Sequence, residues 1–275
     1  MSSLPKTIYI IRHCDKDAKC GDGCSEQGYQ RALLLAGLNG SCKTKINTCN
    51  NSCSGTFDPS KPGYFPKLLG PDVKPILLSP ISKLDSASKG INAKCTSSNR
   101  CCLILNPLAY YYKTQINPNN ELFSDTEPKA VTDYIITHPE LYANQTLIIS
   151  YEHNAIPNMI NAFGISPQLP PWPKSANDRF DLVFKLTFNE GSSVPIMNIF
   201  SQQLFTSDDH TNPFSPGGKQ DIIEPFVNYN TRKQINSTVK PSKKNKSYIW
   251  IIFTMLIILA IVYFIFFRKD NLVKN

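Results

Sequence analysis

The chain has 275 residues, of which 41% are hydrophobic and 18% charged, an ordinary mix for one α/β domain with an appendage. The formal net charge of +8 would suggest a nucleic-acid partner, but residues 240–275 hold seven Lys and Arg against one Asp. The rest of the chain carries only +2 and has no basic stripe with interleaved aromatic residues, so we expect no nucleic-acid partner.

The first third of the chain begins with a short apolar run. Residues 6–12 predict a buried strand, because the run is continuous and β-branched. A polar loop follows, and Ser25 is a candidate N-cap for a helix over residues 27–38. Residues 39–66 are rich in Cys, Asn, Gly and Pro and are interpreted as a surface insertion.

The middle of the chain alternates between apolar runs and amphipathic stretches. Residues 75–79 predict a second strand, and the apolar run over 101–109 favours a third by propensity. Residues 127–137 predict a helix with Pro128 in its first turn, and residues 145–153 predict another buried strand.

The last part of the predicted domain contains a helix over 154–164, stopped by Gly164, and two strands within 178–188 and 193–204. Strands that alternate with helices predict an α/β fold, a three-layer sandwich with a mostly parallel central sheet over residues 1–205. Ligands of such sheets bind beyond the carboxyl ends of the strands.

The C-terminal segment predicts a membrane anchor. Residues 206–247 form a polar linker, and residues 248–267 are twenty residues without a charge. At 1.5 Å per residue they span about 30 Å, the thickness of the hydrocarbon core. With the short basic tail 268–275, this layout predicts a single-pass, tail-anchored membrane protein whose N-terminal domain is cytosolic. Positive charge flanks both ends of the span and gives only weak support for this orientation.

Nine cysteines are present, with no C-x-x-C pair, so we expect free thiols and no metal site. Five N-x-S/T sequons also occur, at Asn39, Asn50, Asn144, Asn236 and Asn245. They are chance products of an Asn-rich composition if the domain is cytosolic. If the domain faced a lumen, the sequons and the cysteines would have another meaning.

Two of the predicted strands end on a histidine beside a charged residue. Arg12-His13 ends the first strand, and Glu152-His153 ends the strand over 145–153. A neutral histidine can attack phosphorus when its other ring nitrogen is held, and arginines suit the phosphoryl oxygens. A nearby carboxylic acid must protonate the leaving oxygen. The pattern therefore favours phosphoryl transfer through a phosphohistidine.

The ordered motifs resemble the histidine phosphatase (phosphoglycerate mutase-like) superfamily over about residues 6–205. "YIIRHCDK" followed by "SEQGYQRALLLAGL" is similar to its opening strand and helix, and "LLSP" to its second strand. "RCCLILNPLA" resembles the helix with the second phosphate-binding arginine, which implies that 101–109 is helical against its propensity. "LIISYEHNAIPNMINAFG" resembles the strand with the second catalytic histidine, and "PPWPKSANDRFDLVFKL" a subset of the family.

The resemblance implies a role for each matching residue. His13 would be the nucleophile, and Arg12, Arg100 and His153 would hold the phosphate. Lys83 is the alternative to Arg100 as the second phosphate-binding cation. Glu152 would be the proton donor only if the strand has ended at residue 151, because neighbours in a strand point to opposite faces. Glu121 and Asp125, in a polar loop, are the alternative proton donors.

Three positions depart from the family pattern. Cys14 stands where the family has Gly, and a side chain there could crowd the phosphate pocket. Asp15 is shorter than the family's Glu. Asn154 replaces the Asp of the acid phosphatase branch, which argues against a phytase-like acid mechanism.

These observations predict a membrane-tethered phosphohydrolase that acts on a phosphomonoester, with a phosphorylated small molecule or phosphoprotein as partner. No metal or organic cofactor is implied. The alternative is a catalytically inactive member that binds a phosphorylated partner or scaffolds at a membrane. Cys14 and the uncertain acid favour this alternative, whereas the intact Arg12-His13, Arg100 and His153 favour the enzyme.

Overall fold

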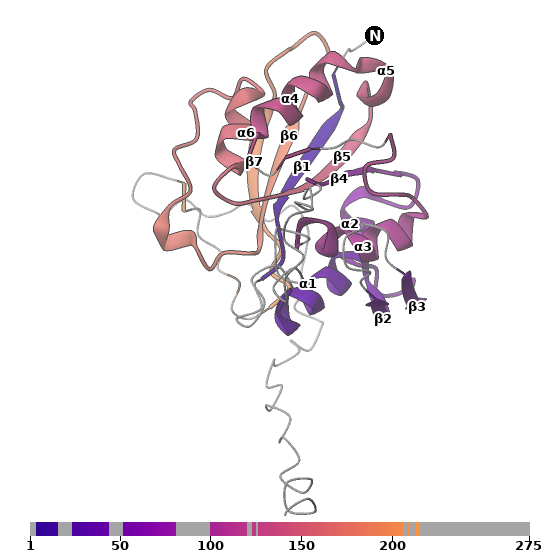
Figure 1. Cartoon of the computed structure of the whole chain (residues 1–275). Helices are drawn as coiled ribbons and strands as arrows, with labels where there is room; N and C mark the ends of the chain where they lie inside the picture. Colours follow the sequence, from indigo (N-terminus) through magenta and orange to yellow (C-terminus); the bar gives the residue numbers. More distant parts are fainter. Residues whose placement is uncertain are drawn as a thin grey trace, which may run out of the picture. The chain divides into compact units, whose positions relative to one another are not determined.

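The computed structural model of the chain (Figure 1) describes residues 4–15, 24–43, 52–80, 100–119, 123–124, 126–205, 208 and 213–214. The chain divides into two units, residues 1–235 and 236–275, and all described residues belong to the first.

A mixed five-stranded sheet forms the centre of this unit, with strand order β4-β5-β1-β6-β7 (Figure 1). Its strands are β1 (Thr7–Arg12), β4 (Ile76–Leu78), β5 (Thr146–Tyr151), β6 (Leu182–Thr187) and β7 (Ile196–Ser201). Strands β4, β5 and β1 are parallel neighbours, whereas β6 is antiparallel to both β1 and β7. Of these five strands β6 alone runs against the others, so the expected α/β fold with a mostly parallel sheet is confirmed.

Strand β1 lies in the middle of the sheet, and all six of its residues are buried. A strand that is buried on both faces needs no alternation of polar and apolar residues, which explains the continuous apolar run that predicted it. Its register is set by β5 on one side, where Thr7 lies opposite Thr146 and Arg12 opposite Tyr151. The carboxyl ends of β1 and β5 therefore lie side by side.

Helices α1 (Glu26–Ala36), α2 (Tyr64–Leu69) and α3 (Arg100–Tyr112) form one group (Figure 1). The predicted N-cap of α1 is confirmed, because the Ser25 hydroxyl accepts a hydrogen bond from the Gly28 N–H at 3.0 Å. The helix ends at Gly37, whose φ of +73° is left-handed backbone that glycine adopts without strain.

Helix α3 corrects the strand that propensity favours over 101–109 and agrees with the helix that the family resemblance implied. Eight of its thirteen residues are buried, among them residues in an unbroken run from Ile104 to Leu108. A helix buried on most of its surface shows little 3.6-residue periodicity, so its apolar run reads like a buried strand.

A second group contains α4 (Pro128–Thr137), α5 (Pro139–Tyr142) and α6 (Ile156–Ala162) (Figure 1). A 3₁₀ turn, η2 (Lys174–Ala176), follows them and leads into β6. The predicted helices over 127–137 and 154–164 are confirmed, each with a proline in its first turn.

Two predicted segments differ in part from the structure. Within the predicted insertion 39–66, β2 (Leu38–Lys43) and β3 (Ser52–Phe57) pair as an antiparallel ribbon, and α2 begins at Tyr64. Packing continues beyond residue 205 into the predicted linker: Asp208 is buried, and the Phe214 ring centroid lies 5.4 Å from that of Trp172.

The predicted membrane span 248–267 lies outside the described residues. Within the described part of the chain, no helix combines the length and the apolar character that a bilayer crossing requires.

Candidate active site

The two predicted strand ends meet at one edge of the sheet. The His13 N–H donates a hydrogen bond of 3.0 Å to the Tyr151 carbonyl, directly after the last register pair of β1 and β5. Strand β5 ends at Tyr151, so Glu152 lies outside it and its side chain need not point to the opposite face from that of His153. This meets the condition under which Glu152 was expected to act as the proton donor. The imidazole rings of His13 and His153 lie with their centroids 5.8 Å apart.

The ring of His13 is held in one tautomer. Its Nδ1 lies 2.8 Å from the Cys14 carbonyl oxygen, which can only accept, so Nδ1 carries the proton. Nε2 then carries a lone pair, and it makes no hydrogen bond to any described residue although the side chain is fully buried. Burial is the main reason that the pKa of His13 falls to about 4. The ring is therefore neutral at physiological pH.

Arg100 begins α3 and brings a second element to His13. Its Nη1 lies 3.4 Å from His13 Nδ1. Both atoms are donors in the tautomer above, so this is a contact between the ring and the guanidinium, and not a hydrogen bond. Arg100 is 6% exposed, so a cation is placed beside the His13 ring away from bulk water.

Arg12 is anchored by the loop that follows η2. Its guanidinium lies 3.8 Å from the centroid of the Phe180 ring, and its Nη1 donates to the carbonyls of Asn177 and Arg179. Burial lowers the pKa of Arg12 to about 10, against the attraction of Glu152, which raises it. The guanidinium stays charged at physiological pH, and its buried Nε makes no hydrogen bond to a described residue.

Glu152 lies between the two histidines. Its Oε1 is 2.6 Å from His153 Nδ1 and 3.7 Å from His13 Nε2, and its Oε2 accepts the Asn154 N–H. Burial alone would raise the pKa of Glu152, but the two imidazoles beside it and the hydrogen bond from the Asn154 N–H outweigh burial and lower the pKa well below its usual range. The carboxyl is therefore ionised in the free protein. These three side chains also lie close enough to share a metal ion.

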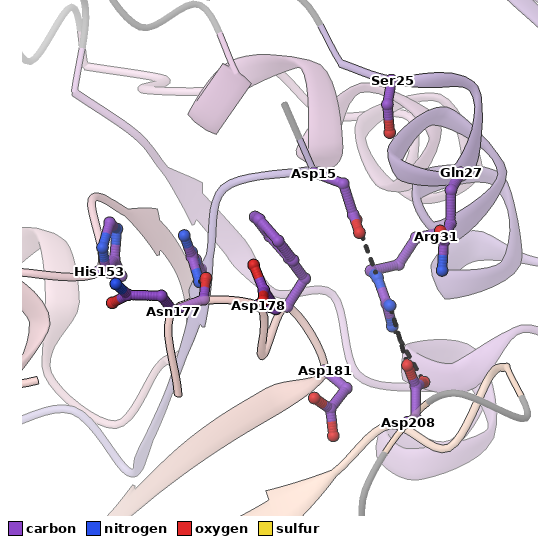
Figure 2. A pocket seen from close by; sticks show the side chains of 11 residues that line it. Asp15, Ser25, Gln27, Arg31, His153, Asn177, Asp178, Asp181 and Asp208 are labelled. Carbon is purple, nitrogen blue, oxygen red and sulfur yellow. Dashed lines mark hydrogen bonds and ion pairs between the residues drawn. The ribbon is translucent and has the colours of Figure 1, made fainter. Parts of the chain in front are cut away.

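A pocket of about 660 Å³ opens beside these residues (Figure 2). His153 and Asn177 lie at one end of it, and Arg31 with Asp15 and Asp208 at the other (Figure 2). Arg12 lines the pocket too, so the pocket adjoins the cationic side of the site. The lining is mostly polar, with Ser25, Gln27, Asp178, Phe180 and Asp181 completing it.

Arg31 belongs to the motif "SEQGYQRALLLAGL", but the sequence predicted no role for it. It is fully buried, and its two terminal nitrogens bind the Asp208 carboxylate at 3.0 and 2.9 Å. Its Nε lies 3.3 Å from Asp15 Oδ2. Arg31 therefore links Asp15, two residues after His13, to Asp208, which follows β7.

Cys14 is the departure from the family pattern that was expected to crowd the phosphate pocket. Its side chain is buried in a disulfide with Cys24 and is not part of the pocket lining. A second disulfide joins Cys42 to Cys53 across β2 and β3. The expectation of free thiols is wrong for these four residues and for Cys102, which is also disulfide-bonded, and it is confirmed for the buried Cys101.

The structure thus brings together five of the predicted site residues: Arg12, His13, Arg100, Glu152 and His153. Lys83, the rival of Arg100, lies outside the described residues, as do Glu121 and Asp125, the substitutes for Glu152. The loop of Asn177 to Phe180, which holds Arg12, carried no predicted role; "PPWPKSANDRF" marked it only as part of the resemblance.

Comparison with known proteins adds no relative. No protein-family model matches the chain, no curated protein does, and no solved structure does.

Proposed function

We propose that this protein is a phosphomonoester hydrolase of the histidine phosphatase type, which works through a phosphohistidine at His13. The observation that carries the proposal is the tautomer of His13: its Nδ1 is held by the Cys14 carbonyl, and its Nε2 is left without a hydrogen bond. A buried imidazole with a bare Nε2 is a neutral nucleophile. The three-layer arrangement expected from the sequence belongs to this proposal.

The first step transfers the phosphoryl group from the substrate oxygen to His13. The Nε2 lone pair forms a bond to phosphorus while the bond between phosphorus and the leaving oxygen breaks. Arg12 and Arg100 offset the charge on the phosphoryl oxygens, since both are buried cations next to the ring. His153 lies across from His13 and serves as a further donor to these oxygens. Water then hydrolyses the phosphohistidine and releases phosphate.

Glu152 supplies the proton that the leaving oxygen needs. The ionised carboxylate would repel a phosphate dianion, because its Oε1 lies only 3.7 Å from the nucleophilic nitrogen. A phosphomonoester monoanion avoids this repulsion by bringing a proton with it. We assign that proton to Glu152 in the complex, from which it passes to the leaving oxygen. The hydrogen bond between Asn154 N–H and Glu152 keeps the carboxyl in place.

A membrane tether over residues 248–267 remains part of the proposal, with a phosphorylated small molecule or phosphoprotein as substrate. The charge-free run of twenty residues supports it. The two disulfides favour an oxidising environment for the domain and weaken the cytosolic placement expected from the sequence.

The test is an assay of phosphate release from p-nitrophenyl phosphate by the full chain in mild detergent. His13→Gln is expected to abolish release, because no other group replaces the attacking nitrogen. His138→Gln is the matched control, since His138 stacks on Tyr134 beyond the end of α4 and is expected to leave the rate unchanged. Release that persists in His13→Gln would rule out the phosphohistidine mechanism.

A second function, a catalytically inactive phosphate-binding protein, is favoured by one observation. Glu152 Oε1 lies close to the position that phosphorus must take in front of His13 Nε2. If the wild type is folded and silent, Glu152→Gln distinguishes the two functions. The inactive protein is expected to bind a phosphopeptide or inorganic phosphate, more tightly after Glu152→Gln, without turnover in either form.

A further inference from the structure

The side chains of His13, Glu152 and His153 also form the donor set of a transition-metal site. Their nearest donor atoms all lie within 4.8 Å of one another, and they come from two different strand ends. Two imidazole nitrogens and one carboxylate oxygen suit zinc and similar ions, whereas Mg²⁺ and Ca²⁺ prefer oxygen ligands. His13 Nε2 is a fully buried donor atom that no described residue satisfies, which is a second, independent sign of a missing ligand.

The surroundings of these donors have the form that supports metal ligands. A histidine ligand usually donates its other ring N–H to a carbonyl or carboxylate, which fixes the tautomer. His13 does so, with Nδ1 2.8 Å from the Cys14 carbonyl oxygen. A ligating carboxylate is in turn held by a hydrogen bond, and the Asn154 N–H binds the second oxygen of Glu152.

Two of the donor spacings are close to those around a tetrahedral ion, and all three donors lie within 4.8 Å of one another. Bonds of about 2.0–2.2 Å place neighbouring ligand atoms about 3.3–3.6 Å apart. His13 Nε2 and Glu152 Oε1 are 3.7 Å apart, so an ion fits between them with little movement. His153 Nδ1 and Glu152 Oε1 are 2.6 Å apart and must separate by less than about 1 Å. The pocket that His153 lines leaves room for a water or anion as the fourth ligand.

The charge of the site limits the affinity. Arg12 and Arg100 oppose a divalent cation, and the Arg100 guanidinium is only 3.4 Å from the far side of the His13 ring. The field of Arg12 is partly offset by Glu152, Asp15 and Asp178. Binding therefore depends on the two imidazoles, and ions that bind only oxygen are not expected to compete.

We propose that His13, Glu152 and His153 bind one zinc-like transition-metal ion. Because the ion and the phosphoryl group both need His13 Nε2, they exclude each other, and the metal acts as a reversible blocker of the site. The inference goes beyond the proposed function, since metal binding requires no turnover.

The test is a calorimetric titration of the tag-free full chain, in mild detergent, with ZnCl₂. One ion per chain is expected to bind at this site, and Glu152→Gln and His153→Gln are each expected to weaken that binding at least about tenfold. His138→Gln should bind as the wild type does. A Co²⁺ titration is expected to give the visible absorption of a four-coordinate site in the wild type and in His138→Gln, but not in the two site variants. Thermal melts establish that each variant is folded.

The proposal is overturned if the folded wild type binds no Zn²⁺, or if binding is the same in Glu152→Gln and His153→Gln, which would place the ion on other residues such as the cysteines. Calorimetry separates this outcome from failure of the enzyme proposal. A protein that releases phosphate but binds no zinc retains its function and loses this inference. A protein that binds zinc at the three residues and releases no phosphate does the reverse.

Discussion

Two buried polar clusters lie at the same end of the domain, and they differ in how completely their hydrogen bonds are satisfied. Arg31 reaches Asp208 through two bonds of 3.0 and 2.9 Å, Gln202 through one of 3.2 Å and Asp15 at 3.3 Å. One atom of this cluster, Gln202 Nε2, makes no hydrogen bond to a described residue, whereas the cluster around His13 has such open nitrogens on both Arg12 and His13.

We interpret this difference as one between a structural role for the Arg31 cluster and a chemical role for the His13 cluster. A buried ion pair with all its hydrogen bonds made is fixed in place and is strongly destabilising to break. A buried donor or acceptor left open costs free energy, and the binding of a ligand is one way to satisfy it. The Arg31 cluster therefore joins the residues that follow β1 and β7, and the His13 cluster is the one that we propose binds the substrate.

The largest expected effect comes from breaking each cluster in turn. Arg31→Met leaves the buried Asp208 carboxylate without its cation and with only the N–H groups of Leu204 and Phe205, so the free energy of unfolding is expected to fall by about 3–5 kcal/mol in urea titrations. His13→Gln conserves volume and removes no completed ion pair, so it should change stability by less than about 1.5 kcal/mol while it abolishes phosphate release.

The control for Arg31→Met is an exposed pair. Lys129 and Asp133 lie 2.6 Å apart on α4, with side chains 74% and 53% exposed. Lys129→Met should therefore cost less than about 1 kcal/mol. The distinction between the clusters is lost if His13→Gln destabilises the domain as strongly as Arg31→Met does.

A smaller effect is expected from Arg100→Lys. Lysine keeps the charge but loses the planar fork that holds two phosphoryl oxygens at once. We expect kcat/KM for p-nitrophenyl phosphate to fall about 10²- to 10³-fold, the usual result of removing one transition-state donor. Stability in urea should stay close to that of the wild type. Unchanged kcat/KM would remove Arg100 from the phosphate site and point to another cation, such as Lys83.

The smallest effect is the pH dependence of the reaction at His13. His13 loses its nucleophilic form as the pH falls through its pKa of about 4, so kcat/KM should fall below that pH. It should also fall above about pH 6, where the phosphate monoanion that protonates Glu152 disappears. Initial rates between pH 3 and 8 would give this profile, and a plateau that extends to pH 8 would contradict the role given to the monoanion.

The lowered pKa of His13 also makes the free energy of unfolding depend on pH. An unfolded histidine takes up a proton below about pH 6.5, whereas His13 in the folded protein does so only near pH 4. The unfolded chain therefore binds more protons between these values, and the free energy of unfolding should decrease as the pH falls through this range. Urea titrations of His13→Gln beside the wild type should show that this contribution is missing in the variant.

Much of the cluster around His13 could be predicted from the sequence because its residues stand at strand ends. Apolar runs that stop at Arg12-His13 and at Glu152-His153 place both pairs at one sheet edge once the strands are parallel. The end of β5 at Tyr151 decides whether Glu152 can serve, and strand boundaries are the least certain part of such a prediction.

Other features depend on contacts between residues far apart in the chain, and the sequence gives no local sign of them. Asp208 reads as part of a polar linker, but its pairing with Arg31 buries it. The disulfide of Cys14 and Cys24 depends on the contact between the end of β1 and the start of α1, where the Ser25 N–H donates to the Asp15 carbonyl. Helix α3 was missed by propensity because burial on most sides hides its period.

The central claim is that His13 carries the phosphoryl group, and the most direct measurement is to trap it there. The full chain would be mixed with p-nitrophenyl phosphate, quenched in alkali to preserve phosphohistidine, digested and examined by mass spectrometry. We expect a phosphoryl group on the peptide that contains His13, present in His138→Gln and missing in His13→Gln. Steady release of phosphate with the group on another residue, or with the same rate in His13→Gln, would contradict it.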